Sequence, residues 1–351
     1  MEPAQSAPPR SPVGGTKDDM LKHSATVFVA CALLLTGCLA QDAKKRQAVV
    51  AGSFYPSDPG LLSRMVDDYL NAAKADSSLG DILGLVVPHA GYVYSGPVAA
   101  AGFVQLKGKK IDRVILIAPS HVERLAPGAA IYDGDYYQTP LGDVPVDTAF
   151  ARKLAAIGPL FQLTGAGHET RTQDGRGEHA IEVQLPFLQR VLGSFKIVPI
   201  VVGDQRYQTC RSLGIALAGL IDGPNTVIIA SSDLAHFHDY AQTVAMDTRL
   251  LAAVSEGDYL GVVRNLERGV WEACGGGPIV ATMMAAERLG GGQARVIKQA
   301  NSGDSVAGDR TRVVGYAAVA FTKSPSVPGQ EYALGKAEQD RLLEIAGKSV
   351  E

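Results

Sequence analysis

Short apolar runs alternate along this chain with segments of helical periodicity. The apolar runs predict strands at residues 82–87, 113–118, 195–202, 226–230, 295–300 and 313–321. Helical spacing predicts a helix that opens at Asp58-Pro59, and others over 98–106, 149–157, 179–192, 240–255, 258–268 and 278–289. Continuous Val/Ile runs indicate strands buried on both faces, and the alternation indicates helices that cover a largely parallel sheet. Because no linker or repeat interrupts residues 50–322, we predict one α/β domain.

The N-terminus has the pattern of a processed segment. Residues 25–37 are apolar and follow Lys22, and a run of 13 suits a secretory signal, whose apolar core is about 7–15 residues long. The run ends in LTGC (35–38), which resembles the lipobox of bacterial lipoproteins. We therefore predict a leader over 1–37, lipidation of Cys38 and a membrane-anchored protein that faces away from the cytoplasm. The alternative is an uncleaved hydrophobic helix on a cytoplasmic protein.

Composition narrows the class of protein. The chain is 46% hydrophobic and 20% charged, which is typical of globular proteins, and its net charge of −3 argues against a nucleic-acid surface. Its four cysteines form no CxxC pair, so a structural zinc site is not predicted.

Polar clusters follow three of the predicted strands. His89 follows the strand at 82–87, Ser120 and His121 follow the one at 113–118, and Asp233 and His236 follow the one at 226–230. Sites in open α/β sheets form at the carboxyl ends of strands, so these side chains should meet. Two histidines plus one anionic ligand leave positions open on iron or copper. The candidates for the anionic ligand are Glu178, Glu182, Asp233 and Cys274.

Cys274 precedes three glycines and a predicted helix. The glycines allow close backbone approach, and a helix N-terminus favours thiolate, whereas the alternative is a small buried hydrophobe. A hydrolase built from Ser231 or Ser232 with Asp233 and His236 is a further alternative, although no GxSxG surrounds these serines. His168 and His238 are expected to be surface or structural residues.

Six ordered motifs resemble those of the Memo family, whose prokaryotic members are called AmmeMemoRadiSam system protein B. They are AGSFYP (51–56), PHAGYVYSGPVAA (88–100), PSH (119–121), EHAIEVQLPFLQ (178–189), SSDLAHF (231–237) and CGGGP (274–278). The resemblance covers about residues 47–322. It implies a three-layer α/β/α domain similar to class III extradiol dioxygenases, placed here at 51–323 after a polar tether at 38–50.

The resemblance also implies the site. His89, His121 and Cys274 would be metal ligands, with cysteine in place of the glutamate of the dioxygenases. His236 would be the acid/base residue and Asp233 would orient it, while the pocket would be lined by Tyr92, Ser120, Glu178, His179 and Gly275. Cysteine is a softer ligand than glutamate, so the expected metal is Fe(II) or Cu, with metal-dependent redox activity.

Two other functions stay open at this point. The cleft could be a non-catalytic module for a peptide or partner, with Tyr55, Tyr92 and Tyr94 as aromatic contacts. A lipid anchor would instead suit a membrane-attached metal carrier.

The family also suggests partners. Its members are associated with a radical-SAM protein and with AMMECR-type domains. Residues 324–351 comprise a linker and a helix that resembles the start of an AMMECR-type domain, although an ordinary terminal helix is an equal alternative. Family members are usually cytosolic, which conflicts with the lipobox.

Overall fold

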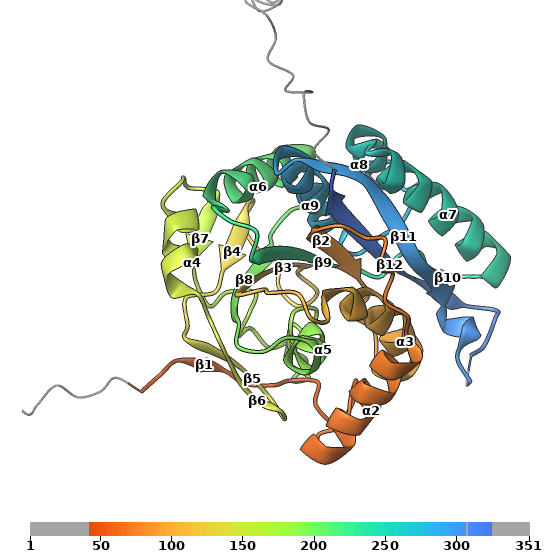
Figure 1. Ribbon diagram of the computed structural model, residues 1–351, viewed down its shortest axis with the longest axis horizontal. Coiled ribbons are helices and arrows are strands. Elements are labelled where there is room, and N and C mark those ends of the chain that lie inside the picture. Colours follow the sequence, from red (N-terminus) through yellow and green to blue (C-terminus); the bar gives the residue numbers. More distant parts are fainter. Residues whose placement is uncertain (1–41, 307, 325–351) are drawn as a thin grey trace, which may run out of the picture. The chain divides into compact units, whose positions relative to one another are not determined.

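The structure is a computed structural model that describes residues 42–306 and 308–324, and a nine-stranded sheet runs through its centre (Figure 1). The strand order is β10-β12-β2-β9-β3-β8-β4-β7, and β11 pairs with β12. These strands are β2 Ile82–Val87, β3 Arg113–Pro119, β4 Ala129–Ile131, β7 Phe161–Leu163, β8 Lys196–Val202, β9 Thr226–Ser231, β10 His236–His238, β11 Gly291–Asn301 and β12 Val313–Lys323.

Helices cover both faces of this sheet. They are α2 Pro59–Ala72, α3 Tyr92–Phe103, α4 Thr148–Ala155, α5 Leu185–Val191, α6 Tyr207–Leu220, α7 Tyr240–Glu256, α8 Tyr259–Glu267 and α9 Gly276–Arg288. Alternate strand residues feed two cores: Leu85 and Leu116 pack with α2, α3 and α5, whereas Val86 and Ile115 pack with α4 and α6 to α9. The predicted three-layer α/β/α domain is confirmed.

The sheet is more mixed than the sequence predicted. Its central strands β2, β9, β3 and β8 are parallel, but β12 is antiparallel to β2 and β4 is antiparallel to β8. The helix predicted over 179–192 is also shorter: a 3-10 turn at Glu182–Gln184 precedes α5, which has Pro186 in its first turn. Pro lacks the N–H that a continuous helix would need at that position.

Several short elements and one long helix had not been predicted. A second sheet joins β1 Lys45–Arg46, β5 Tyr136–Thr139 and β6 Gly142–Pro145. Helix α6 lacks a strong apolar pattern, because only Leu213 and Leu217 among its six buried residues are large aliphatic side chains.

The tether expected over 38–50 is part of the fold from Lys44 onward. Arg46 is only 3% exposed and forms an ion pair with Glu182, which is fully buried. The Glu182 carboxylate also accepts hydrogen bonds from the Val49 and Val50 N–H groups and from the Tyr55 hydroxyl. A buried carboxylate needs such donors, so this segment cannot leave the domain without stranding Glu182.

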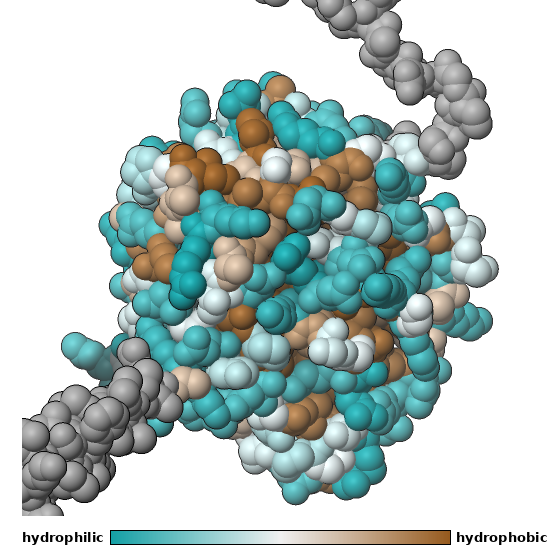
Figure 2. Space-filling view, turned by 60° about the vertical axis from the view of Figure 1, so that its left-hand side comes forward, coloured by the Kyte–Doolittle hydropathy of each residue, from teal (hydrophilic) through white to brown (hydrophobic). Residues whose placement is uncertain are grey.

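The expected leader with Cys38 and the expected terminal helix both lie outside the described residues. No helix of the described part of the chain is long and apolar enough to cross a membrane. The face shown in Figure 2 is largely hydrophilic, with hydrophobic residues gathered toward its upper part.

Asp247 of α7 supports the segment that leads to His236. Its carboxylate accepts a hydrogen bond from the Ala235 N–H at 3.1 Å. A Cβ on Gly315 would lie 1.8 Å from an Asp247 oxygen, so a larger residue at this position of β12 would displace the Asp247 carboxylate. Burial raises the pKa of Asp247 to about 7.

This pKa predicts a specific pH dependence of stability. Because the unfolded pKa is near 3.8, folding favours the protonated form, and the contribution of Asp247 to stability falls as the pH rises from about 4 to about 7. Asp247→Asn keeps an acceptor for Ala235 but cannot ionise. We expect the variant to be more stable than the parent at pH 8, by up to about 4 kcal/mol, and equally stable near pH 4.

Urea unfolding across this pH range measures the difference. The matched control is Asp68→Asn, because Asp68 is an exposed carboxylate on α2 and should give parallel curves. A variant that follows the parent at every pH would contradict the assignment.

Candidate metal centre

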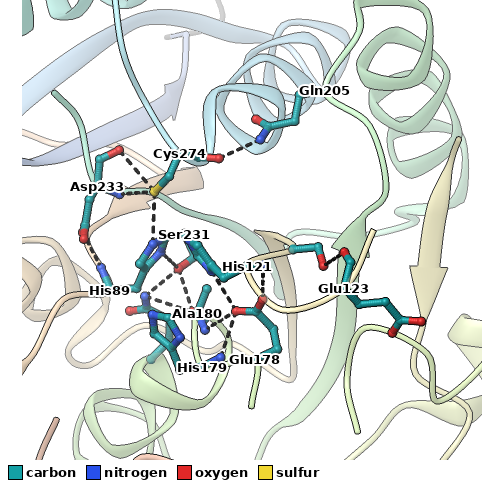
Figure 3. A network of polar contacts seen from close by, with 12 residues as sticks. His89, His121, Glu123, Glu178, His179, Ala180, Gln205, Ser231, Asp233 and Cys274 are labelled. Carbon is teal, nitrogen blue, oxygen red and sulfur yellow. Dashed lines mark hydrogen bonds and ion pairs between the residues drawn. The ribbon is translucent and has the colours of Figure 1, made fainter. Parts of the chain in front are cut away.

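Three neighbouring parallel strands end at one edge of the sheet and bring the candidate residues together. Val87 at the end of β2 pairs with Ser231 at the end of β9, and β3 lies on the other side of β9. His89 follows β2, His121 follows β3, and both imidazoles point into the same space (Figure 3). Cys274 approaches this space from the loop before α9.

The donor atoms of His89, His121 and Cys274 form a compact group. One ligand atom from each residue lies within 4.8 Å of the other two, and the Cys274 Sγ is 3.1 Å from the His89 Nε2. His89 is 2% exposed, while His121 is the more open of the two histidines. A single ion could contact all three atoms after small side-chain shifts, and its remaining positions would stay open.

Ser231 fixes the tautomer of His89. The single hydrogen of the Ser231 hydroxyl goes to the Ala180 carbonyl at 2.6 Å, so the hydroxyl oxygen accepts from the His89 Nδ1–H at 2.9 Å. The Gln184 amide donates to the same oxygen. The His89 Nε2 therefore carries its lone pair and faces Cys274, as a metal ligand requires. Burial lowers the pKa of His89 well below its ordinary value, which keeps the ring neutral.

Glu178 orients the imidazole of His121 as Ser231 orients that of His89. Its Oε1 lies 3.0 Å from the His121 Nδ1 and accepts that N–H, which leaves the Nε2 as the ligand atom. Burial lowers the pKa of His121, but the hydrogen bond to Glu178 and the charge of this carboxylate outweigh burial and raise the pKa, so a bound ion would take the place of a proton on the Nε2. Burial raises the pKa of Glu178, but hydrogen bonds from His121 and from backbone N–H groups outweigh it and hold the pKa at about 2. A carboxylate behind a ligating imidazole both orients the ring and makes it a stronger donor.

The loop that carries Cys274 is packed so closely that it needs its glycines. A Cβ on Gly275 would come within 2.3 Å of the Ser231 carbonyl oxygen. Gln205 then clamps the loop, because its amide donates to the Cys274 carbonyl at 2.7 Å and accepts from the Gly277 N–H at 2.6 Å (Figure 3). The glycines serve close approach rather than a positive φ, since none of the three is in the left-handed region.

Cys274 is a thiol rather than the expected thiolate in the metal-free protein. Burial raises its pKa, and the nearby Asp233 carboxylate raises it further, despite the N–H groups that face the sulfur. A helix N-terminus does follow the residue, but burial is the larger effect here. A bound cation would displace the thiol proton.

The expected pairing of Asp233 with His236 is wrong. The Asp233 Oδ1 instead accepts the His89 N–H at 2.8 Å, and the described residues show no hydrogen bond between Asp233 and His236. The His236 backbone is held by Glu272, and its side chain lies at the wall of a cavity beside Cys274. Asp233 therefore positions a ligand, and His236 acts on Asp233 through its charge rather than through a hydrogen bond.

The other predicted pocket residues divide into two groups. Tyr92 and Tyr55 are buried, and their hydroxyls donate to the Val183 carbonyl and to Glu182, so the prediction that they line a cleft is wrong. Ser120 lies beside His121 but donates its hydroxyl to the Glu123 carbonyl. Of the three tyrosines proposed as contacts, Tyr94 is the exposed one, at 42%.

His179 belongs to the same centre, and its ring meets the His89 ring edge-on at 5.6 Å between centroids. Its ring stacks on that of His121 at 4.8 Å between centroids, and burial lowers its pKa to about 4. His121, Glu178 and His179 form a second group whose ligand atoms lie within 4.8 Å of one another. Because Glu178 already accepts the His121 and Ala180 N–H groups, this second group is the weaker candidate.

The remaining alternatives from the sequence are resolved by hydrogen bonding. Ser231 and Ser232 are fully buried and donate to the Ala180 and Asp233 carbonyls, so neither is available as a nucleophile. His168 is structural: it is buried between Tyr137 and Ala130, and burial lowers its pKa to about 4. His238 is half-buried and pairs with Glu272.

Two cavities flank the ligand group. One of about 550 Å³ reaches Cys274 and His236, and one of about 630 Å³ reaches Ser120 and His121. Gln205 lines both, and sequence reasoning had missed it because a lone glutamine in a loop carries no pattern.

Comparison with known proteins fits this arrangement. The model of the family described as Memo-like protein matches residues 46–320. A MEMO1 family protein of Methanopyrus kandleri is 35% identical over 290 residues, which cover 80% of this chain and 99% of that protein. A MEMO1 family protein of Methanococcoides burtonii is 38% identical over 277 residues, covering 78% and 98%. A solved structure of an uncharacterised Escherichia coli K12 protein is more distant, with 13% identity, a TM-score of 0.43 and coverage of 67% and 99%. The matches to the family model and to these relatives show that the chain belongs to the Memo family.

Proposed function

We propose that His89, His121 and Cys274 hold one Fe(II) or Cu ion and that this centre supports metal-dependent redox chemistry. The observation that carries the proposal is the orientation of the two imidazoles. Both Nδ1–H groups are taken by fixed acceptors, Ser231 and Glu178, so in each ring the Nε2 is the atom left to bind an ion. Such outer acceptors are a regular feature of metal-ligating histidines.

The donor set favours these metals over magnesium or calcium. Two neutral imidazoles and a thiolate are borderline-to-soft ligands, which suit copper and iron, whereas hard cations prefer oxygen. When bound, such an ion would supply open coordination positions and one-electron chemistry.

The protein would supply the remaining functions through its own residues. Asp233 holds the His89 backbone, and Gln205 holds the Cys274 loop, so the ligands are positioned from both sides. The His236 side chain shares a cavity wall with Cys274, and we propose that its imidazole holds or moves a proton there. Its own backbone is fixed by Glu272.

Metal content tests the ligand set directly. We expect protein purified without oxygen, and offered Fe(II) or Cu(I), to bind close to one equivalent by elemental analysis. Cys274→Ser should lose most of this metal, because a hydroxyl replaces the thiolate. Cys210→Ser is the matched control, since Cys210 is buried in α6 and belongs to neither ligand group of the described residues. Metal-free parent protein, or equal metal in the Cys274 variant, would refute the site.

The orientation argument predicts a loss of affinity from residues that never touch the metal. Ser231→Ala removes the acceptor of the His89 Nδ1–H, and Glu178→Gln replaces a carboxylate acceptor by a weaker amide. Each should weaken metal binding about 10–100-fold in competition with a chelator. Glu123→Gln is the control, because this nearby carboxylate serves Gly167 and Thr170 instead. Unchanged affinity in both variants would mean that the rings are not held as described.

Redox function is tested separately from binding. Metal-loaded protein should consume oxygen with at least one small phenol or thiol, and His236→Gln should slow that uptake while retaining the metal. Oxygen uptake that is absent for every substrate, with the metal fully bound, would remove the redox part of the proposal and leave a metal-binding protein.

A further inference from the structure

The cavity beside Cys274 has the walls of a small-molecule pocket. Helix α9 packs against both α6 and α8 on one side of the sheet, and the cavity of about 550 Å³ lies among their ends (Figure 1). Its apolar wall is made by Val263, Leu266, Trp271 and Val280. This volume lies within the usual range of about 300–1,000 Å³ for ligand pockets, and the wall is of the usual kind.

The positive groups of the lining are partly or fully engaged. The N–H groups at the start of α9 are already used, because Gly276 donates to the Ala273 carbonyl and Gly277 donates to Gln205. Arg206 is the one guanidinium in the wall, and its Nε pairs with Asp204 at 3.2 Å, which partly neutralises its charge. The start of α9 is therefore not left to receive a negatively charged group, and Arg206 is an exposed cation that already has a carboxylate beside it.

The two carboxylates in the wall, Glu272 and Glu267, differ in whether they already have hydrogen-bond partners. Glu272 is engaged with both the His238 ring and the His236 N–H. The Glu267 carboxylate, by contrast, takes part in none of the ion pairs or side-chain hydrogen bonds found among the described residues, and it is exposed. It is also the last residue of α8, where the helix dipole adds negative potential.

We infer that this pocket binds a small molecule with an apolar, ring-sized body and a protonated amine, with the body against Trp271 and Leu266 and the amine near Glu267. Trp271 also favours an amine over an anion, since the face of an indole ring attracts cations. Because Cys274 is part of the wall, the pocket would be the substrate site of the metal centre, and this role rests on the function proposed above. Occupancy of the pocket does not need the metal.

The sequence provides its own reporter for this pocket. Trp271 is the single tryptophan of the chain, so selectively excited tryptophan emission reports on this cavity alone. The probes are 2-phenylethylamine, 2-phenylethanol and phenylacetate, which share a body and differ in charge. We expect a saturable change of emission in the metal-free protein, with the amine binding about three- to tenfold more tightly than the carboxylate, as a single exposed charge allows.

Two variants distinguish the contribution of the ligand's ring to binding from the contribution of its charge. Glu267→Gln should abolish the preference for the amine, and Glu256→Gln, which removes an exposed carboxylate at the end of α7, should not. Leu266→Gln should weaken all three probes, because an amide then faces the ring. Circular dichroism establishes that each variant is folded.

Each result decides a different point. No saturable change with any probe, checked by calorimetry, would overturn the pocket, and equal binding of the three probes or a preference for phenylacetate would overturn the amine. If the metal-free protein binds the amine but no metal can be loaded, the proposed redox function fails and the pocket stands. If both bind, the amine should perturb the absorption spectrum of the metal-loaded protein.

Discussion

The parallel register of β2, β9 and β3 is the constraint on which the rest of the site depends. Three parallel strands have their carboxyl ends on the same side of the sheet. Polar residues can follow each strand there without interrupting the hydrogen bonds between the strands. His89, His121 and the Ser231–Asp233 segment use these three ends. The parallel strand β8 and the antiparallel strands β12 and β4 enlarge the sheet but deliver no ligand.

Burial then dictates how the histidines are held. An imidazole that is removed from water must have its N–H satisfied, and in this protein the acceptors lie behind the rings, away from the cavity. The same requirement governs Ser231, whose one hydrogen is taken by Ala180, and thereby decides the tautomer of His89. The polar network is consequently a single unit: a change at Ala180 or Gln184 would be felt at a nitrogen that neither residue contacts.

The sequence predicted most of this site but less of what supports it. The strands with continuous Val and Ile runs, such as 82–87 and 226–230, were placed to within about one residue, because burial on both faces leaves a clear signal. The ligands were found because histidines are scarce and followed these strands. The sequence placed Arg46 in a polar tether and Glu182 on a helix, and it did not predict their ion pair. No local pattern shows that two charges far apart in sequence will be buried together. The roles predicted for Asp233 and Tyr92 were wrong for a related reason: the position of a residue in a sequence motif does not show where its side chain points.

The Cys274 loop joins the two parts of the chemistry. One side of the residue presents the sulfur to His89, and the other side forms the wall of the apolar pocket. Gly275, Gly276 and Gly277 let this loop lie against Ser231, Leu266 and Gln205 at distances that any side chain would prevent. Because the loop is gripped at both of its ends by the single Gln205 amide, it cannot shift at the pocket without shifting at the sulfur. The wall of the pocket and a donor atom of the ligand group therefore lie on one closely packed loop.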